Sequence, residues 1–334
     1  MTNTNRQIVL AQLPGGERLS ERHFALVEGE RPSPADGEVL VRPLYVSLDA
    51  ANRAWMQGVT YRSALSAGQV MAGGSLAEVV ESRAPGLAAG DLVFADTGWQ
   101  EWAALPARGL TPLPDITPRT HLLSVFGVAG LTAYFGLLEC GRPTAGETVA
   151  VSAAAGAVGS FVGQIAKIKG CRVVGIAGGP EKCAMLKSEF GFDEAVDYKA
   201  GDVRRALRAT CPDGLDVYFD NTGGDILEAA LFAMNNHGRI ACCGAVSQYD
   251  GAAPAHGPRG VPGLIVTKRL TLTGFVLYDF YARREAALAE LQGWVREGKL
   301  KVREDVMEGL ENLPRALIGL LAGENVGKRM VKVR

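Results

Sequence analysis

The stretch SAAAGAVGS, Ser152 to Ser160, follows the short apolar run TVAV and decides which fold the chain is expected to adopt. It has the spacing of the fingerprint G-x-G-x-x-G of dinucleotide-binding turns, except that Ala154 stands at the first glycine position. In such a turn Gly156 would allow close approach of a pyrophosphate, and Gly159 would allow tight contact between helix and strand. The alternative is a small-residue turn in the core of any doubly wound fold.

The residues on both sides of this turn alternate between strand and helix patterns. Thr148–Ser152 is predicted to be a buried strand, and apolar residues from Val158 to Ile168 recur at the spacing of a helix that Gly170 would end. This order of strand, turn and amphipathic helix favours the dinucleotide cradle. Further strands are predicted at 171–177, 215–220, 239–244 and 270–277, with helical patterns around 227–234 and 287–295, which indicates an α/β fold with a doubly wound parallel (Rossmann) sheet.

The N-terminal third of the chain has a different pattern. From about residue 39 to 114, short strands alternate with prolines and glycines, which is typical of an irregular β-rich domain. The last thirty-odd residues are predicted to carry one helix and a final strand and to return to this first domain. We therefore expect a discontinuous β-rich substrate domain of residues 1–124 and 300–334, and a dinucleotide-binding domain of residues 125–299.

The amino-acid composition limits which binding partners and which cellular compartment are expected for the protein. The 334 residues carry a formal net charge of −1 with Lys and Arg spread along the chain, which argues against nucleic acid or an anionic membrane as a partner. The uncharged stretches 121–138 and 149–166 contain glycines and polar residues, so they are interpreted as buried segments rather than spanning helices. The cysteines form no C-x-x-C pair and the N-terminus has no apolar leader, which predicts a cytoplasmic protein.

The end of the second predicted strand indicates which dinucleotide the turn would bind. An NAD-type site expects an acidic residue there for the ribose 2′-hydroxyl, but the strand ends in Ala177 and GGPEK follows. A small residue leaves room for a 2′-phosphate, and Lys182 would supply a positive charge for it. Glu181 could still bind a ribose, and Lys182 could be a solvated lysine at a helix start. NADP(H) is the favoured cofactor.

Several ordered stretches carry a resemblance to a known family: VSLDAANRAWM, GLTAYFGL, SAAAGAVGSFVGQIAKIKGCRVVG, GFDEAVDYK, FDNTGG, CGAVSQY and GENVGK. Over most of its length the chain is similar to the medium-chain dehydrogenase/reductase superfamily, and more narrowly to its zinc-independent branch of prostaglandin and leukotriene reductases, plant double-bond reductases and bacterial curcumin reductase. This resemblance implies a GroES-like β-rich catalytic domain beside the Rossmann domain. Ala50 and Ala72 depart from the proline and arginine common in that branch, which puts the identity of the substrate in doubt.

The resemblance also implies roles for individual residues of a cofactor site. Lys182 and Tyr198 would hold the phosphate at the adenosine end, and Asn221 would lie near the ribose and pyrophosphate. Asn325 would close over the cofactor from the C-terminal segment. The turn residues Gly156, Ala157, Val158 and Gly159 would cradle the pyrophosphate. The segment of Cys243, Gly244, Ala245, Val246, Ser247 and Tyr249 would run under the nicotinamide half. The backbone of Phe275, Val276 and Leu277 would meet the carboxamide.

The sequence argues independently against a metal. Catalytic zinc takes three protein ligands from Cys, His and Asp or Glu, but GQVMAGG and VSLDAAN stand where zinc-dependent relatives carry a GHE-like sequence and an early cysteine. No four-cysteine lobe for structural zinc is present. The histidines, His23, His121, His237 and His256, are scattered without metal spacing, so no metal is expected.

Without a metal, conjugated enals and enones suit such a site better than simple ketones. Hydride can attack the β-carbon while negative charge collects on the carbonyl oxygen as an enolate, and the protein has to place a donor there. Tyr249 is the candidate catalytic donor, because its phenol is protonated at neutral pH. A ribose hydroxyl of the cofactor could serve instead, which would leave Tyr249 a positioning or lining role.

Aromatic and apolar residues of the first domain and of 270–278 are candidates for the substrate pocket. These are Tyr61, Trp55, Met71, Trp99 and Tyr278, with core packing as the alternative for Tyr61 and Trp99. Asp49 and Arg53 are expected to fix a turn by hydrogen bonds rather than to act in catalysis.

Two other functions stay open at this point. A quinone reductase would use the same fold and NADPH, and a cofactor-binding scaffold would keep the fold without turnover. The alternating strand LTLTGFVL could be an edge strand that pairs with a second subunit, so a homodimer is expected, with an ordinary internal strand as the alternative.

Overall fold

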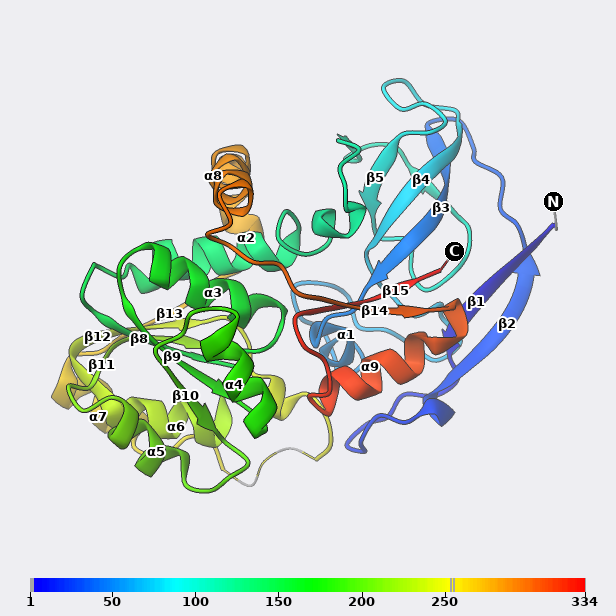
Figure 1. Ribbon diagram of the computed structural model, residues 1–334. Coiled ribbons are helices and arrows are strands. Elements are labelled where there is room, and N and C mark those ends of the chain that lie inside the picture. The colour runs from blue at the N-terminus through cyan, green and yellow to red at the C-terminus, as the bar shows by residue number, and fades with distance from the viewer. Residues whose placement is uncertain (1–2, 253, 255, 334) are drawn as a thin grey trace.

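The computed structural model describes residues 3–252, 254 and 256–333, which form two large sheets and a small hairpin sheet (Figure 1). One large sheet is parallel and has the strands β8 (Thr148–Ser152), β9 (Arg172–Ala177), β10 (Glu194–Asp197), β11 (Leu215–Asp220), β12 (Met234–Cys242) and β13 (Thr271–Gly274). Their spatial order is β10-β9-β8-β11-β12-β13, and all the pairings are parallel. This is the Rossmann order, in which the chain reverses direction across the sheet between β8 and β11, so the predicted parallel sheet is confirmed.

Helices cover both faces of the parallel sheet: α2 (Val128–Phe135), α3 (Ala157–Ile168), α4 (Pro180–Ser188), α5 (Val203–Thr210), α6 (Gly224–Ala233), α7 (Val261–Lys268) and α8 (Arg284–Arg296). Neighbouring residues of a strand point to opposite faces. Val149 therefore packs in the apolar cluster with α2, α3 and α8, while Ala150 packs in the cluster with α5, α6 and α7. The predicted alternation of strands and helices is confirmed, but the edge strand β10 was not among the strands predicted from the sequence.

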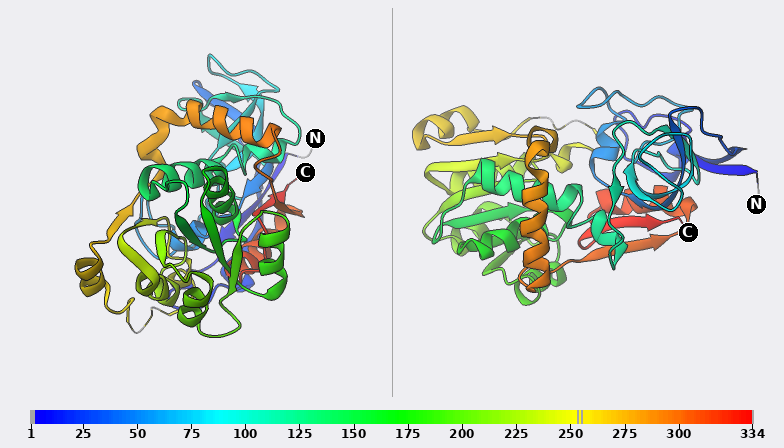
Figure 2. Two further views of the ribbon diagram at one scale, coloured as in Figure 1. Left: turned by 60° about the vertical axis from the view of Figure 1, so that its left-hand side comes forward. Right: turned by 90° about the horizontal axis from the view of Figure 1, so that it is seen from above.

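The second large sheet has the strands β3 (Glu38–Ser47), β4 (Ser75–Ser82), β5 (Leu92–Ala95), β6 (Ala103–Pro106), β7 (Pro112–Leu113), β14 (Glu304–Glu308) and β15 (Lys328–Lys332). Most of its pairings are antiparallel, and β15 lies between β3 and β14, so the two C-terminal strands extend one edge of a sheet of N-terminal strands (Figure 2). The expectation of a single strand in the last segment is wrong, because β14 also forms there. Its sequence EDVME is charged and half-exposed, so no apolar run announces it.

A hairpin of β1 (Thr4–Leu10) and β2 (Phe24–Glu30) covers one side of this second sheet, with the helices α1 (Ala51–Ala54) and α9 (Leu313–Leu321). Ile8, Trp99 and Val331 belong to one buried apolar cluster with residues of α9, so the two ends of the chain share a core. Short helical turns complete the fold: η1 (Glu21–His23), η2 (Arg119–Leu122), η3 (Gly136–Gly141), η4 (Val246–Gln248), η5 (Leu277–Arg283) and η6 (Leu310–Asn312).

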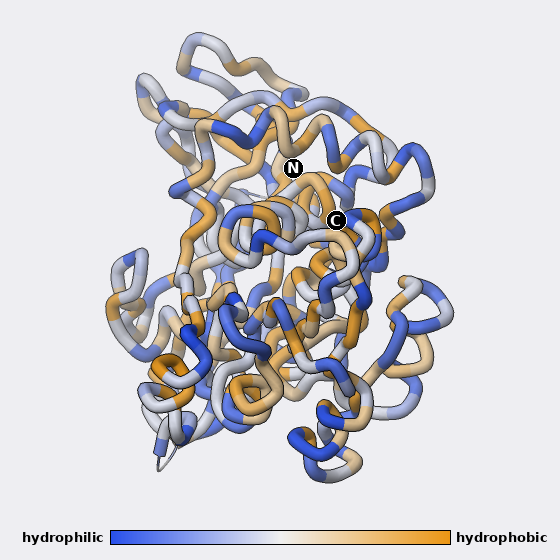
Figure 3. The backbone as a smooth tube through the Cα atoms, turned by 90° about the vertical axis from the view of Figure 1, so that its left-hand side faces the viewer, coloured by the Kyte–Doolittle hydropathy of each residue, from blue (hydrophilic) through white to orange (hydrophobic). Residues whose placement is uncertain are grey.

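The two uncharged stretches of the sequence are interior segments, as predicted. Residues 128–135 form α2, and residues 149–166 run through β8, the glycine turn and α3, where most side chains are buried. No helix among residues 3–252, 254 and 256–333 is long and apolar enough to cross a membrane. Hydrophilic residues concentrate on the outer loops of the backbone trace (Figure 3).

Close packing of α3 against the link between β9 and β10 gives a first testable prediction. A Cβ built on Gly163 would lie 1.9 Å from Cζ of Phe192, so Gly163→Ala has to displace a buried ring. We expect Gly163→Ala to reduce the free energy of unfolding by about 1–3 kcal/mol. Calorimetry should show a lower thermal midpoint than that of the unaltered protein.

Gly293 provides the matched control, since it also lies inside a helix, α8, but has no atom within 4 Å of the added Cβ. Gly293→Ala should raise the midpoint, because alanine favours a helix interior over glycine by about 1 kcal/mol. An unchanged or raised midpoint for Gly163→Ala would show that the contact with Phe192 is not a tight one.

Candidate functional site

A cleft of ≈ 640 Å³ is lined by residues from both large sheets. The carboxyl ends of β8 and β11 meet at this cleft, which is where the Rossmann order predicts ligand binding. Most sequence candidates for cofactor and substrate contacts line it: Gly156, Ala157, Val158, Gly159, Lys182, Tyr198, Asn221, Cys243, Gly244, Val246, Tyr249, Phe275, Val276, Leu277, Asn325, Trp55, Tyr61 and Tyr278.

The turn after β8 brings the N-terminus of α3 to the cleft. A Cβ on Gly159 would lie 2.3 Å from the carbonyl oxygen of Ala153, so only glycine allows the helix to approach this closely. Ala153 takes a left-handed φ of 49°, whereas Ala154 keeps a negative φ, which explains why alanine is tolerated at the first fingerprint position. Gly156 is the N-cap residue of α3. The free amides and the dipole of this helix end favour an anion such as a pyrophosphate.

The ends of β8 and β11 are joined by hydrogen bonds beside this turn. Asn221 donates its side-chain amide to the carbonyl of Ser152 at 2.7 Å, and its backbone amide to Oγ of Ser152 at 2.9 Å. The backbone amides of Cys243 and Gly244 donate to the carbonyl of Asp220 at 2.8 and 3.1 Å. Burial, and then the carboxylate of Asp220, raise the pKa of the Cys243 thiol to about 12, so this cysteine stays a neutral wall of the cleft.

Lys182, the residue predicted to contact the adenosine phosphate, lines the same cleft. Its ammonium group donates to the carbonyls of Gly323 and Asn325 at 2.6 and 2.7 Å. Partial burial lowers the pKa of Lys182, and repulsion by Lys199 and Arg329 lowers it further. Asp305 and Glu324 offset part of this repulsion, and an added phosphate would stabilise the ammonium group further.

Tyr198 and Gly178 line the same cleft as Lys182. A Cβ on Gly178 would lie 2.9 Å from the ring of Tyr198 and 2.9 Å from Cε of Lys199, so these two side chains pack directly against the bare glycine. Sequence reasoning missed Lys199 and Arg329. Lys199 could have been found from its place next to Tyr198, but Arg329 lies in β15, far away in the chain.

Tyr249 lines the cleft with its hydroxyl held by its own loop. The backbone amide of Ala245 donates to the Tyr249 hydroxyl oxygen at 3.1 Å. An oxygen that already accepts a hydrogen bond keeps its own proton for donation to another group. Ala245 and Ser247 do not line the cleft; Ser247 donates its hydroxyl to the carbonyl of Thr222 at 2.6 Å and so fixes the loop from behind.

Aromatic side chains from both halves of the molecule meet in another part of the cleft. The rings of Trp55 and Tyr61 are in edge contact with centroids 6.4 Å apart, and Tyr61 meets Tyr278 at 6.3 Å. The guanidinium of Arg62 lies 4.3 Å from the Trp55 ring. Trp55, Tyr61 and Arg62 follow β3, whereas Tyr278 belongs to η5 beside the parallel sheet, so this wall joins the two halves of the molecule.

Met71 and Trp99 do not line the cleft, and their assignment to the substrate pocket needs correction. Both side chains are fully buried in the apolar cluster of the second sheet, where Trp99 stacks on Phe24 with centroids 5.6 Å apart. The physical reason is that the hairpin β1–β2 covers the face on which they lie. In a β-rich sequence, the pattern of apolar residues does not distinguish a side chain in the core from a side chain in the wall of a pocket.

An ion pair that the sequence did not reveal joins Asp49, a half-exposed residue that lines the cleft, to the buried Lys328 behind it. Lys328, only 1% exposed, donates to the carboxylate of Asp49 and to the carbonyl of Leu48. Burial alone would raise the pKa of Asp49, but the charge of Lys328 and hydrogen bonds from Lys328 and Ser47 hold it below its ordinary value. Asp49 fixes its turn as expected, whereas Arg53 makes its contacts elsewhere.

The residues present fit a phosphorylated dinucleotide. The turn offers a helix N-terminus and a surface without side chains, and the cationic pocket around Lys182 lies at the same cleft. No group of three or more His, Cys, Asp or Glu residues in the described part of the chain could hold a metal ion.

Comparison with known families gives two matches along the chain. The family described as the N-terminal domain of oxidoreductase matches residues 6–113, and the family described as zinc-binding dehydrogenase matches residues 157–293. The chain is 42% identical over 335 residues to the NADPH-dependent curcumin reductase of Escherichia coli (strain K12), covering 98% of this chain and 97% of that protein.

Further relatives agree with these matches. Prostaglandin reductase 1 of Bos taurus is 45% identical over 92% of this chain and 93% of its own length. The NADP(+)-dependent 2-alkenal reductase of Nicotiana tabacum is 40% identical over 99% and 98%. The crystal structure of CurA from Vibrio vulnificus in complex with NADPH superposes with a TM-score of 0.94 at 41% identity, covering 98% of this chain and 99% of that one. The chain therefore belongs to the medium-chain dehydrogenase/reductase superfamily, in the zinc-independent branch that its sequence motifs indicate.

Proposed function

We propose that the protein is an NADPH-dependent reductase of the carbon–carbon double bond of α,β-unsaturated aldehydes and ketones. The observation that carries this proposal is that a dinucleotide cradle, a cationic pocket for a 2′-phosphate and the phenol of Tyr249 share one cleft. The relatives named curcumin, prostaglandin and 2-alkenal reductases support the reaction class, and the NADPH-bound neighbour supports the cofactor.

In this proposal the two halves of the chain have separate tasks. Residues 125–299 would bind the dinucleotide, and residues 1–124 with 300–334 would form the substrate side and return Asn325 to the cofactor. The cofactor would be held by the sequence candidates that line the cleft, and Lys199, which packs against Gly178 beside Tyr198, would join Lys182 and Tyr198 around the phosphate. Trp55, Tyr61 and Tyr278 would hold a flat conjugated substrate between their rings.

When bound, the nicotinamide supplies the hydride that goes to the β-carbon. Tyr249 would donate its proton toward the carbonyl oxygen, where the enolate charge develops. The hydrogen bond from the Ala245 amide supports this role. The phenolic oxygen accepts this bond, so the O–H proton of Tyr249 is left to donate to the substrate. The apolar and aromatic walls would exclude water around this donor, which strengthens its interaction with the developing charge.

The proposal extends to assembly and location. β13 is the edge strand of the parallel sheet, and Val266 of the neighbouring α7 is 73% exposed. An unpaired edge next to exposed apolar residues is suited to continue the sheet into a second copy of the chain, as a homodimer. Free cysteines throughout the described residues are consistent with a place in the reducing cytoplasm.

A substrate panel tests the function directly. With NADPH, the purified protein should oxidise the cofactor in the presence of enals and enones, and it should give saturated carbonyl products without reducing the carbonyl group. Turnover of quinones alone would make the protein a quinone reductase. Cofactor binding without turnover of any acceptor would make it a scaffold.

Lys182→Ala tests the phosphate pocket. Loss of a hydrogen bond to a charged group costs about 1.5–3 kcal/mol, so the Kd for NADPH should rise roughly 10- to 100-fold. The Kd for NADH should change much less, and the preference for NADPH should disappear. Fluorescence titration with both cofactors separates loss of the phosphate contact from loss of the contacts to Gly323 and Asn325, since the latter would weaken both cofactors alike.

Lys187→Ala is the control, because Lys187 lies on the same helix and pairs with Glu194 at the surface. It should leave both constants unchanged. An unaltered ratio of the two constants in Lys182→Ala would remove this residue from the phosphate site.

Tyr249→Phe tests the proton donor. Loss of a positioned acid lowers a rate by about 10²- to 10⁴-fold, so kcat with an enone should fall by at least about 10²-fold while the Kd for NADPH stays unchanged. Steady-state kinetics and cofactor titration measure the two quantities. Tyr45→Phe, in β3 and outside the cleft, is the matched control. Full turnover by Tyr249→Phe would transfer the role of donor to a cofactor hydroxyl.

A further inference from the structure

Two side chains one helical turn apart reach from the second sheet's domain to the loop that carries Tyr249. Arg53, in α1, donates Nε to Oδ1 of Asp250 at 3.1 Å. Gln57, just beyond α1, donates its side-chain amide to the carbonyl of Tyr249 at 2.9 Å. The two side chains thus bind two successive residues of the loop.

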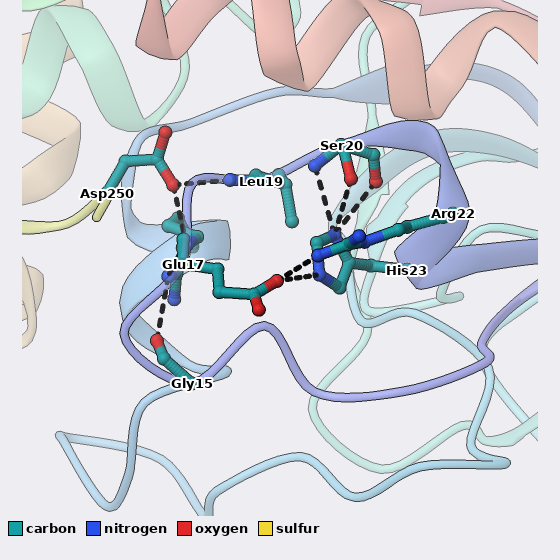
Figure 4. Close-up of polar contacts among 8 residues, drawn as sticks. Gly15, Glu17, Leu19, Ser20, Arg22, His23 and Asp250 are labelled. Atoms are coloured by element: carbon teal, nitrogen blue, oxygen red, sulfur yellow. Dashed lines mark hydrogen bonds and ion pairs between the residues drawn. The ribbon is translucent and has the colours of Figure 1, made fainter. Parts of the chain in front are cut away.

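Asp250 accepts a second hydrogen bond from the same half of the molecule. The backbone amide of Leu19, in the segment between β1 and β2, donates to Oδ1 of Asp250 at 2.8 Å (Figure 4). The loop leaves β12 of the parallel sheet, yet the side chain at its far end is bound by groups of the other sheet's domain. Its near end stays fixed to β11 through the amides of Cys243 and Gly244 on Asp220.

The guanidinium of Arg53 has no room to find another partner. The side chain is completely buried, and Nη2 donates to the carbonyls of Gly15 and Glu17 at 3.2 and 3.0 Å. Nη1 has no hydrogen-bond partner among the residues that the structure describes. A buried charge without a paired carboxylate is strongly unfavourable, so the ion pair with Asp250 holds both side chains at this place.

The segment that receives Arg53 is itself fixed. The carboxylate of Glu17 contacts Arg22 and lies 3.8 Å from Nε2 of His23, and the amide of Ser20 donates to Nδ1 of His23 at 3.0 Å (Figure 4). His23 is completely buried. Asp250 therefore binds to a preformed surface rather than to a loose loop.

We propose that Arg53 and Asp250 are positioning residues for Tyr249: their ion pair holds the end of loop 243–250 against the second sheet's domain and thereby keeps the Tyr249 hydroxyl in the cleft. This proposal rests on the proposed function in so far as Tyr249 is the donor. The alternative is that the ion pair only stabilises the fold. In that case, substitution of Asp250 would affect kcat independently of Tyr249.

Hydrogen–deuterium exchange of the cofactor-free protein tests the holding role without activity. Asp250→Ala removes the acceptor of both donors, so the amide of Leu19 and the peptide spanning 243–250 should exchange at least about 10-fold faster, while β8 stays unchanged. Asp250→Asn, which keeps an acceptor but loses the charge, serves if Asp250→Ala does not fold. Asp115→Asn is the control, because Asp115 forms an exposed ion pair with Arg119 far along the chain.

A double-mutant cycle with an enone tests the link to Tyr249. Asp250→Ala should lower kcat about 10-fold or more through misplacement of the donor, with the Kd for NADPH changed less than about 2-fold. In a Tyr249→Phe background the same change should have no further effect on kcat, because the group that it positions is gone. Arg53→Lys keeps the charge but loses the fork that binds three acceptors, and it should follow Asp250→Ala in both backgrounds.

The outcomes separate this proposal from the proposed function. Three results would each overturn the positioning role while the reductase activity stands. They are an unchanged exchange rate in residues 243–250, effects on kcat that multiply in the double variant, and full turnover by Tyr249→Phe. An unaltered protein that reduces no enone or enal would refute the function, and the exchange experiment alone would then decide whether the ion pair holds the loop.

Discussion

The close approach of α3 to the end of β8 is the contact on which the nucleotide-facing half of the structure depends. Gly159 allows it because any Cβ at this position would collide with the carbonyl of Ala153. The same approach sets Gly156 at the head of the helix, where it forms a bridge with Gly327 from the other end of the chain. A single missing methyl group therefore determines where a helix dipole, a turn and a distant segment meet.

The C-terminal segment 323–328 connects features that are otherwise far apart. Gly323 and Asn325 accept hydrogen bonds from Lys182, Gly327 donates to the turn at Ala155 at 2.7 Å, and Lys328 pairs with Asp49. Gly327 has a φ of 71°, and a Cβ there would lie 2.1 Å from the carbonyl of Arg303, so the path of the segment is tightly constrained. Lys182, the glycine turn and Asp49 are thus all bonded to one short piece of backbone.

The sequence predicts those parts of the site whose chemistry is local. The strand, turn and helix around Gly156 follow from periodicity and glycine spacing, and Lys182 follows from its distance beyond the second strand. Lys328 and Arg329 could not be predicted, because a cation in a terminal strand gives the pattern of a solvated residue until the fold buries it. Met71 and Trp99 failed for the converse reason, since only the covering hairpin distinguishes a core side chain from a cleft wall.

The anchoring of Asp250 means that loop 243–250 is bonded to both halves of the molecule. Its start is held at the end of β11 through Cys243 and Gly244, and its end is held by Leu19, Arg53 and Gln57 of the other half. A rotation of one half against the other would have to stretch this loop or break one of its two attachments. The loop is therefore a short mechanical link across the cleft, and its length limits how far the two walls can separate.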